Sequence, residues 1–158
     1  MKKEKRYYVA YGSNLNIEQM AYRCPGAKII GTSEIPNYRL LFKGSGTGAY
    51  LTIEPSEGRK VPVAVWEVTK WDECALDRYE GYPRFYYKKE IELPVKPDQG
   101  GRTTRRKVFV YIMDETRRCG IPSRYYIETC LDGYKDFGFD TDFLFEALGD
   151  TMDAMESE

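Results

Sequence analysis

Two short segments of this 158-residue chain have residue types and spacing that could do chemistry. The first is the turn Gly12-Ser13-Asn14, which follows the aromatic and β-branched run 7–11. The run predicts a strand, and the turn residues predict a sharp change of direction. A strand that ends in such a turn presents consecutive backbone N–H groups, which can hold an oxyanion or a carboxylate. An ordinary strand-to-helix turn has the same spacing, so this segment alone leaves both interpretations open.

The second segment ends at Glu80. Thr69, with Asp72 three residues later, predicts the start of a helix, and Gly81 followed by Pro83 predicts its end. Glu80 then lies in the last helical turn, where the carbonyl end of the helix dipole raises the pKa of a carboxyl group. A cation is the usual residue at that position. A solvated surface glutamate is the alternative, and position alone favours it.

The chain contains no histidine. This excludes Ser-His-Asp and Cys-His catalysis, histidine-ligated zinc and imidazole general bases. Acid–base chemistry near neutral pH must therefore come from a carboxylate, Cys, Lys or Tyr side chain with a shifted pKa.

Taken together, the two segments resemble the gamma-glutamylcyclotransferase family, which includes the gamma-glutamylamine cyclotransferases and plant avirulence-induced relatives. The family's Tyr-Gly-Ser-Asn turn matches residues 11–14, and its Asp-x-x-Glu-Gly segment matches residues 77–81. The Pro-Ser-x-x-Tyr segment of its longer members matches residues 122–126. The three motifs occur in the family's order, and the correspondence covers residues 7 to 145.

The resemblance implies an enzyme that releases 5-oxoproline from a γ-glutamyl amino acid, peptide or amine. In this reaction the substrate's α-amine attacks its own γ-carbonyl, with Glu80 as general acid and base and with no metal or organic cofactor. We expect no hydrolysis, because nothing in the chain activates water or a side-chain nucleophile. The motifs hold the glutamyl part that all such substrates share, so they do not identify the leaving amine. The substrate-binding residues that the resemblance implies are Tyr8, Val9, Ala10, Tyr11, Gly12, Ser13, Asn14 and Tyr126.

One more tyrosine could line the pocket, and two neighbours compete for the place. Alternation along the strand after Glu80 puts Tyr87 on the same face as the apolar Ile91 and Leu93. The Pro-x-x-Tyr segment of the family's short members instead corresponds to Tyr86. Because an apolar strand face would point into a barrel, we expect Tyr87 to line the pocket.

The remaining pattern predicts a single α+β domain over residues 1–158, a mixed β-barrel with helices packed outside. Residues 150–158 are acidic and without pattern, so we expect a frayed tail. Glycine-rich turns are expected at residues 44–48 and 97–101, and the first lacks the Gly-Lys-Ser/Thr of a phosphate-binding loop. The expected strands are 5–11, 27–34, 38–43, 49–54, 61–68, 85–95 and 107–113, and the expected helices are 16–23, 70–80, 123–135 and 141–148.

Composition limits the possible partners and the compartment. A net charge of −1 and a pI near 5.7 give no overall attraction to nucleic acid. No apolar run is long enough to span a membrane, and the basic cluster 2–6 lacks the apolar core of a signal peptide. Four cysteines without CxxC spacing favour reduced thiols and a cytoplasmic location. We therefore expect a small-molecule γ-glutamyl substrate, neither nucleic acid nor membrane as partner, and leave a homodimer open.

Three other functions compete with this interpretation. The cations between residues 102 and 118 could bind RNA, although a charge run is more often a solvated face. The carboxylates of residues 132–142 could hold a divalent metal, but they lack the spacing of a calcium loop. A relative that binds a small ligand without catalysis is the third, and the presence of Glu80 argues against it.

Overall fold

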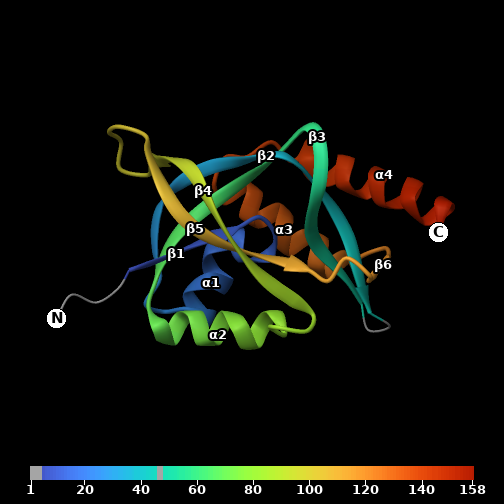
Figure 1. The fold of residues 1–158 in the computed structure, drawn as a ribbon, viewed down its shortest axis with the longest axis horizontal. Coiled ribbons are helices and arrows are strands. Elements are labelled where there is room, and N and C mark those ends of the chain that lie inside the picture. Colours follow the sequence, from blue (N-terminus) through green and yellow to red (C-terminus); the bar gives the residue numbers. More distant parts are fainter. Residues whose placement is uncertain (1–4, 46–47) are drawn as a thin grey trace.

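The computed structural model describes residues 5–45 and 48–158. Within this part of the chain, helices separate three groups of strands, and two helices follow the last strand, as Figure 1 shows. The strands are β1 (Arg6–Ala10), β2 (Lys28–Ser45), β3 (Gly48–Val68), β4 (Tyr86–Pro97), β5 (Thr104–Met113) and β6 (Arg118–Cys119). The helices are the 3-10 turn η1 (Ser13–Leu15), α1 (Ile17–Arg23), α2 (Lys70–Glu80), α3 (Arg124–Asp136) and α4 (Asp142–Ser157).

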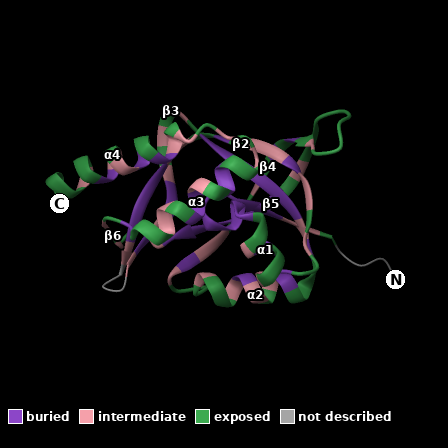
Figure 2. Ribbon diagram, turned by 180° about the vertical axis from the view of Figure 1, so that it is seen from behind, coloured by how far each residue is buried: buried purple, intermediate pink, exposed green. Residues whose placement is uncertain are grey.

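The strands close into a barrel, which confirms the expected fold class. Their order is β3-β1-β5-β4-β2-β6, and an additional pairing of β2 with β3 closes five of them into a ring, with β6 outside it. The pair of β1 and β5 is parallel and the other pairs are antiparallel, so the barrel is mixed. Buried residues follow the strands of the barrel and the inner faces of α1, α2 and α3 (Figure 2).

The two faces of the sheet have different roles. Directly paired residues share a face, so Tyr8, which pairs with Phe109, lies on the same side as Tyr111 two residues further on. Lys88 pairs with Tyr111 and forms an ion pair with Glu73 of α2, so this is the outer face that α2 covers. The opposite face carries the pair Val9 and Val110 and forms the barrel interior.

The hairpin of β2 and β3 is longer than the sequence predicts. The expected strands 27–34 and 38–43 form one strand, as do 49–54 and 61–68. The break expected near Pro36 is only a register shift between Pro36 and Tyr38. Asn37 adopts φ 60° there, and its side chain accepts a hydrogen bond of 3.0 Å from the Gly58 N–H. A bulge of this kind lets a strand bend without ending.

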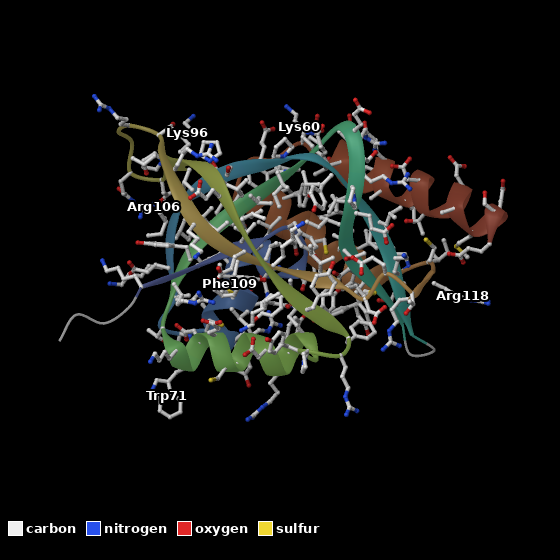
Figure 3. All side chains as sticks on the ribbon, viewed as in Figure 1. Lys60, Trp71, Lys96, Arg106, Phe109 and Arg118 are labelled. Atoms are coloured by element: carbon white, nitrogen blue, oxygen red, sulfur yellow. The ribbon has the colours of Figure 1, made fainter. Side chains whose placement is uncertain are left out.

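The two turns expected from glycine can be placed in part. Ser45 pairs with Gly48 at the end of the β2–β3 hairpin, while residues 46 and 47 of the expected turn 44–48 lie outside the described residues. The turn 97–101 joins β4 to β5, and Gly100 adopts φ 81°. Lys96 and Arg106 lie by this projecting hairpin in Figure 3. Two cations of the hairpin pair with acids of β4, Arg105 with Glu92 and Lys107 with Glu90.

The helices lie close to their expected positions, except at the C-terminal end. The expected helix 141–148 continues to Ser157, so the expectation of a frayed tail over 150–158 is wrong. The segment is held by Thr151, which is fully buried and accepts a hydrogen bond of 2.9 Å from the Phe42 N–H of β2. Asp150 also pairs with Arg59 of β3 at 2.8 Å. None of the helices in the described part of the chain has both the length and the apolar character that a membrane span requires.

Replacement of Thr151 by Val should destabilise the protein by about 1–3 kcal/mol, because the buried Phe42 N–H then has no acceptor. Urea unfolding measures the change. Thr141→Val, at the N-cap of the same helix, is the matched control, since the Thr141 side chain makes no capping hydrogen bond. Equal stabilities of Thr151→Val and Thr141→Val would show that the Thr151 hydroxyl does not hold α4 to the barrel.

Candidate active site

A pocket of about 380 Å³ opens on the outer face of the barrel, where the ends of β1, α2 and α3 meet. Its volume lies in the range that small-molecule sites occupy. The residues that line it are Tyr8, Val9, Tyr11, Gly12, Ser13, Asn14, Tyr50, Leu51, Arg78, Tyr79, Glu80, Gly81, Phe85, Tyr86, Tyr111 and Tyr126.

The structure therefore brings together the three motifs found in the sequence. Glu80, Tyr126 and the turn Gly12-Ser13-Asn14 all line this pocket, as do Tyr8, Val9 and Tyr11. Ala10 is buried beside them but does not line the pocket. Tyr50, Leu51 and Tyr111 line the pocket too, although no sequence motif includes them. Tyr79 and Gly81, which flank Glu80, are further lining residues that the sequence analysis does not predict.

The expectation of Tyr87 in the pocket is wrong, and Tyr86 lines it instead. Tyr86 lies two residues from Lys88 and shares its outer face, whereas Tyr87 pairs with Ile112 on the opposite face. Alternation identified the strand's apolar face correctly, but the pocket lies outside the barrel and not within it. The hydroxyl of Tyr86 donates a hydrogen bond of 2.7 Å to the Leu51 carbonyl, and that of Tyr87 bonds to Glu115.

Glu80 is half-buried at the end of α2. The helix has the predicted boundaries, with a capping box formed by Thr69 and Asp72 and with Gly81 at φ 65° as its C-cap. Burial raises the pKa of Glu80 to about 8, and the charge of Arg23 partly offsets that rise. Among the described residues, the carboxylate has neither a hydrogen-bond nor an ion-pair partner. Such a group can bind and release a proton near neutral pH.

Tyrosines from several elements surround this carboxyl group. Burial is the main cause of the raised pKa values of the tyrosines around Glu80. The negative charge of Glu80 raises these pKa values further. These side chains therefore stay protonated at neutral pH and act as neutral hydrogen-bonding groups. They are Tyr8 and Tyr11 from β1 and the turn after it, Tyr79 from α2, Tyr86 from β4, Tyr111 from β5 and Tyr126 from α3.

The turn after β1 presents the free amides that its sequence predicts. It forms η1, in which the N–H groups of Leu15 and Asn16 bond back to Gly12 and Ser13. In the described part of the chain, no protein acceptor bonds the N–H groups of Gly12, Ser13 or Asn14. All three residues line the pocket, and an N–H group without a protein acceptor is the kind of donor that a bound oxygen can use.

Gly12 keeps this turn close to α3. A Cβ atom at Gly12 would lie 3.3 Å from the Tyr126 hydroxyl and 3.4 Å from the Leu51 Cβ. The Tyr126 hydroxyl accepts a hydrogen bond of 3.0 Å from the Leu51 N–H, which fixes it at this edge of the pocket. A larger residue at position 12 would therefore push Tyr126 away from its place.

A group of charges holds α2, and hence Glu80, against the barrel. Lys88 of β4 pairs with Glu73 at 2.7 Å and with Asp77 at 2.8 Å, both on α2. Asp77 also accepts a hydrogen bond of 2.6 Å from the Tyr111 hydroxyl. Arg6 of β1 pairs with Glu73 at 3.0 Å. The aspartate of the Asp-x-x-Glu-Gly segment thus faces the sheet and sets the position of the glutamate one turn later.

The described residues contain no group of three or more acidic or cysteine side chains that could hold a metal ion. The four cysteines are free, with Cys24 and Cys130 buried.

Glu80 should make the stability of the protein depend on pH. The unfolded carboxyl loses its proton near pH 4.5, whereas the folded one keeps it to about pH 8. Between these values the unfolded state binds fewer protons, so the free energy of unfolding falls as pH rises. Glu80→Gln should reduce this fall, which urea titrations at several pH values would measure. Parallel curves for the variant and the wild type over this range would contradict the burial of an ionisable Glu80.

Comparison with known proteins identifies the relatives of this chain. The family described as "Gamma-glutamyl cyclotransferase, AIG2-like" matches residues 8–128. Curated proteins named gamma-glutamylcyclotransferase are 34% identical over 110 residues in Bos taurus and 31% identical over 147 residues in Homo sapiens. These alignments cover 65% and 89% of this chain, and 58% and 76% of the cattle and human proteins.

Solved structures agree with this relationship. A structure named gamma-glutamyl cyclotransferase superposes with a TM-score of 0.77 at 26% identity, covering 91% of this chain and 86% of its own. YkqA from Bacillus subtilis shares the fold, with a TM-score of 0.73 at 16% identity over 93% of this chain and 55% of its own. The motifs around the pocket, the barrel that positions them and the match over most of the sequence agree: the chain belongs to the gamma-glutamylcyclotransferase family.

Proposed function

We propose that this protein releases 5-oxoproline from a γ-glutamyl amide, with Glu80 as general acid and base. The observation that carries the proposal is a carboxyl group with a pKa of about 8 and no protein partner among the described residues. It lines the same pocket as three free backbone amides. The relatives named gamma-glutamylcyclotransferase support the same reaction class.

The substrate supplies its own nucleophile in this reaction. Its α-amine attacks the γ-carbonyl carbon, the five-membered ring closes, and the C–N bond to the leaving amine breaks. Holding the glutamyl chain in a bent conformation supplies much of the rate, because well-oriented intramolecular reactions reach effective molarities of about 10⁵ M or more. A pocket enclosed by aromatic side chains suits this task.

Glu80 moves the protons that ring closure requires. An α-ammonium group is not nucleophilic, so the ionised carboxylate first takes a proton from it. The carboxyl group then gives a proton to the departing amine as the C–N bond breaks. One group performs both steps efficiently when its pKa lies near the working pH, which is the condition that burial creates at Glu80.

The turn and the tyrosines hold the oxygens of the substrate. The N–H groups of Gly12, Ser13 and Asn14 stabilise either the developing negative charge on the γ-carbonyl oxygen or the α-carboxylate. Tyr126, whose hydroxyl lies close to Gly12, orients the glutamyl chain from the side of α3. These contacts would bring the α-amine toward Glu80.

Glu80→Gln should fold and lose at least ~10²-fold in kcat, the scale of general acid–base catalysis. Release of 5-oxoproline from a panel of γ-glutamyl amino acids, γ-glutamyl-lysine and γ-glutamyl alkylamines measures the loss and identifies the leaving amine. Glu128→Gln, on the exposed side of α3, is the control and should keep wild-type turnover. A Glu80→Gln variant with near wild-type kcat would remove Glu80 from the mechanism.

The enzyme should require a free α-amine on its substrate. An N-acetyl γ-glutamyl compound keeps both the carboxylate and the scissile amide but has no nucleophile, so no product should form. With the unmodified substrate, 5-oxoproline should appear from the start, without free glutamate. Glutamate as the first product, or turnover of the N-acetyl compound, would mean that water or an enzyme side chain attacks.

A further inference from the structure

Arg23 lies next to the pocket, although it does not line it. It occupies the last turn of α1, and its guanidinium carbon lies 3.5 Å from the centre of the Tyr79 ring. One guanidinium nitrogen donates to the Asn14 side-chain oxygen, and another donates to Gln19 at 3.4 Å. Stacking on the ring together with two hydrogen bonds fixes the plane of the guanidinium group.

The contact with Arg23 determines which way the amide of Asn14 faces. A guanidinium group has only donors, so it must meet the oxygen of that amide and not its nitrogen. The amide nitrogen of Asn14 then faces Tyr8 and donates a hydrogen bond of 2.9 Å to the Tyr8 hydroxyl.

The direction of this second bond leaves the proton of Tyr8 available. A hydroxyl that accepts a hydrogen bond can still donate its own. Among the described residues, the Tyr8 hydroxyl has no hydrogen-bond partner other than Asn14. Tyr8 is buried in the protein and lines the pocket, so a bound molecule is the acceptor that remains for its proton.

We propose that Arg23 is a positioning residue that, through the amide of Asn14, holds the hydroxyl of Tyr8 as a hydrogen-bond donor to an oxygen of the bound substrate. The inference rests on the proposed function for the identity of that substrate, a γ-glutamyl compound. It assigns a role to a residue outside the three sequence motifs.

A purely structural role of Arg23 is the alternative. A cation in the last turn of a helix stabilises the helix dipole wherever its side chain points. That role affects stability but not the direction of the bond between Asn14 and Tyr8. The two roles are therefore separated by variants that reverse this bond without removing a side chain.

Asn14→Asp reverses the bond. The aspartate has the shape of asparagine and can still pair with Arg23, but its oxygens only accept, so Tyr8 must donate to it. The proton of Tyr8 is then lost to the substrate. Asn14→Asp should lower kcat/KM by about 10- to 100-fold, the scale of a hydrogen bond to a charged group, and Tyr8→Phe by a similar factor. The double variant should lie within about 2-fold of either single variant, because both changes remove the same interaction.

Arg23→Met tests the first contact in this series of hydrogen bonds, the one between Arg23 and Asn14. Without the guanidinium group the amide of Asn14 can turn over, so kcat/KM should fall about 10-fold in the wild-type background but less than about 2-fold in the Tyr8→Phe background. Arg23→Lys keeps a donor and should recover part of the loss. The control is Arg124→Met on α3, whose side chain is 92% exposed and which should match the wild type.

All kinetic comparisons are made at alkaline pH, where kcat/KM no longer changes with pH. Glu80 is then ionised in every variant, so a new charge at position 14 does not alter its protonation. Thermal unfolding shows whether each variant folds. If Asn14→Asp does not fold, the comparison of Arg23→Met, Tyr8→Phe and their double variant still tests the proposal. Independent, additive losses in either double variant would overturn the proposal. So would wild-type activity of Asn14→Asp.

Calorimetric binding of 5-oxoproline separates this inference from the proposed function. If the wild type binds 5-oxoproline but does not turn over γ-glutamyl compounds, the proposed function alone is wrong. The affinities of the same variants for 5-oxoproline would then test the positioning role of Arg23. If the wild type turns over these compounds but the double variants show additive losses, the positioning role of Arg23 alone is wrong. A wild type that does neither would overturn both.

Discussion

The structure depends on keeping one carboxyl group where neither solvent nor a protein partner fully stabilises its charge. Glu80 is half-buried at the end of α2, and no described residue bonds to its carboxylate. A lone acid in such a place costs stability, so other interactions must keep α2 in position. Lys88 does so by pairing with both Glu73 and Asp77 from the neighbouring strand β4. The protein thus pairs the acids on the flank of the helix and leaves the one at its end unpaired.

The same arrangement explains why the site lies on the outside of the barrel. The interior carries buried apolar side chains such as Val110 and Ile112, which offer a polar substrate no hydrogen-bonding group. The outer face carries Tyr8, Tyr111 and Tyr86, whose rings provide enclosing apolar surface and whose hydroxyls bond to the protein. Tyrosine suits this wall because its ring excludes water while its hydroxyl can bond to the protein or to a bound molecule.

Much of this could be predicted from the sequence, because the relevant signals are local. The cap at Thr69, the stop at Gly81 and the turn after β1 depend on neighbouring residues, and they placed Glu80 and the free amides correctly. The absence of histidine narrowed the chemistry further. Alternation failed at Tyr87, because a period of two identifies an apolar face but not whether the site lies on that face.

The interactions that the sequence did not reveal join residues far apart in the chain. Nothing in the local pattern connects Tyr111 with Asp77, or Thr151 with Phe42, and the end of α4 was therefore expected to fray. The contact of Arg23 with the Tyr79 ring is another long-range interaction of this kind. An arginine in the last turn of a helix is common, so the sequence alone does not indicate this contact.

The pKa of Glu80 is the quantity on which the account depends most, and it can be measured in the protein without substrate. Carbon-13 NMR of glutamate-labelled protein, with the side-chain carboxyl signal of Glu80 assigned by its loss in Glu80→Gln, gives the titration curve directly. The account predicts a midpoint near 8, displaced from the ordinary value of 4.5 by burial. A midpoint close to 4.5 would mean that Glu80 is a solvated surface carboxylate, and the general acid–base role proposed for it would be contradicted.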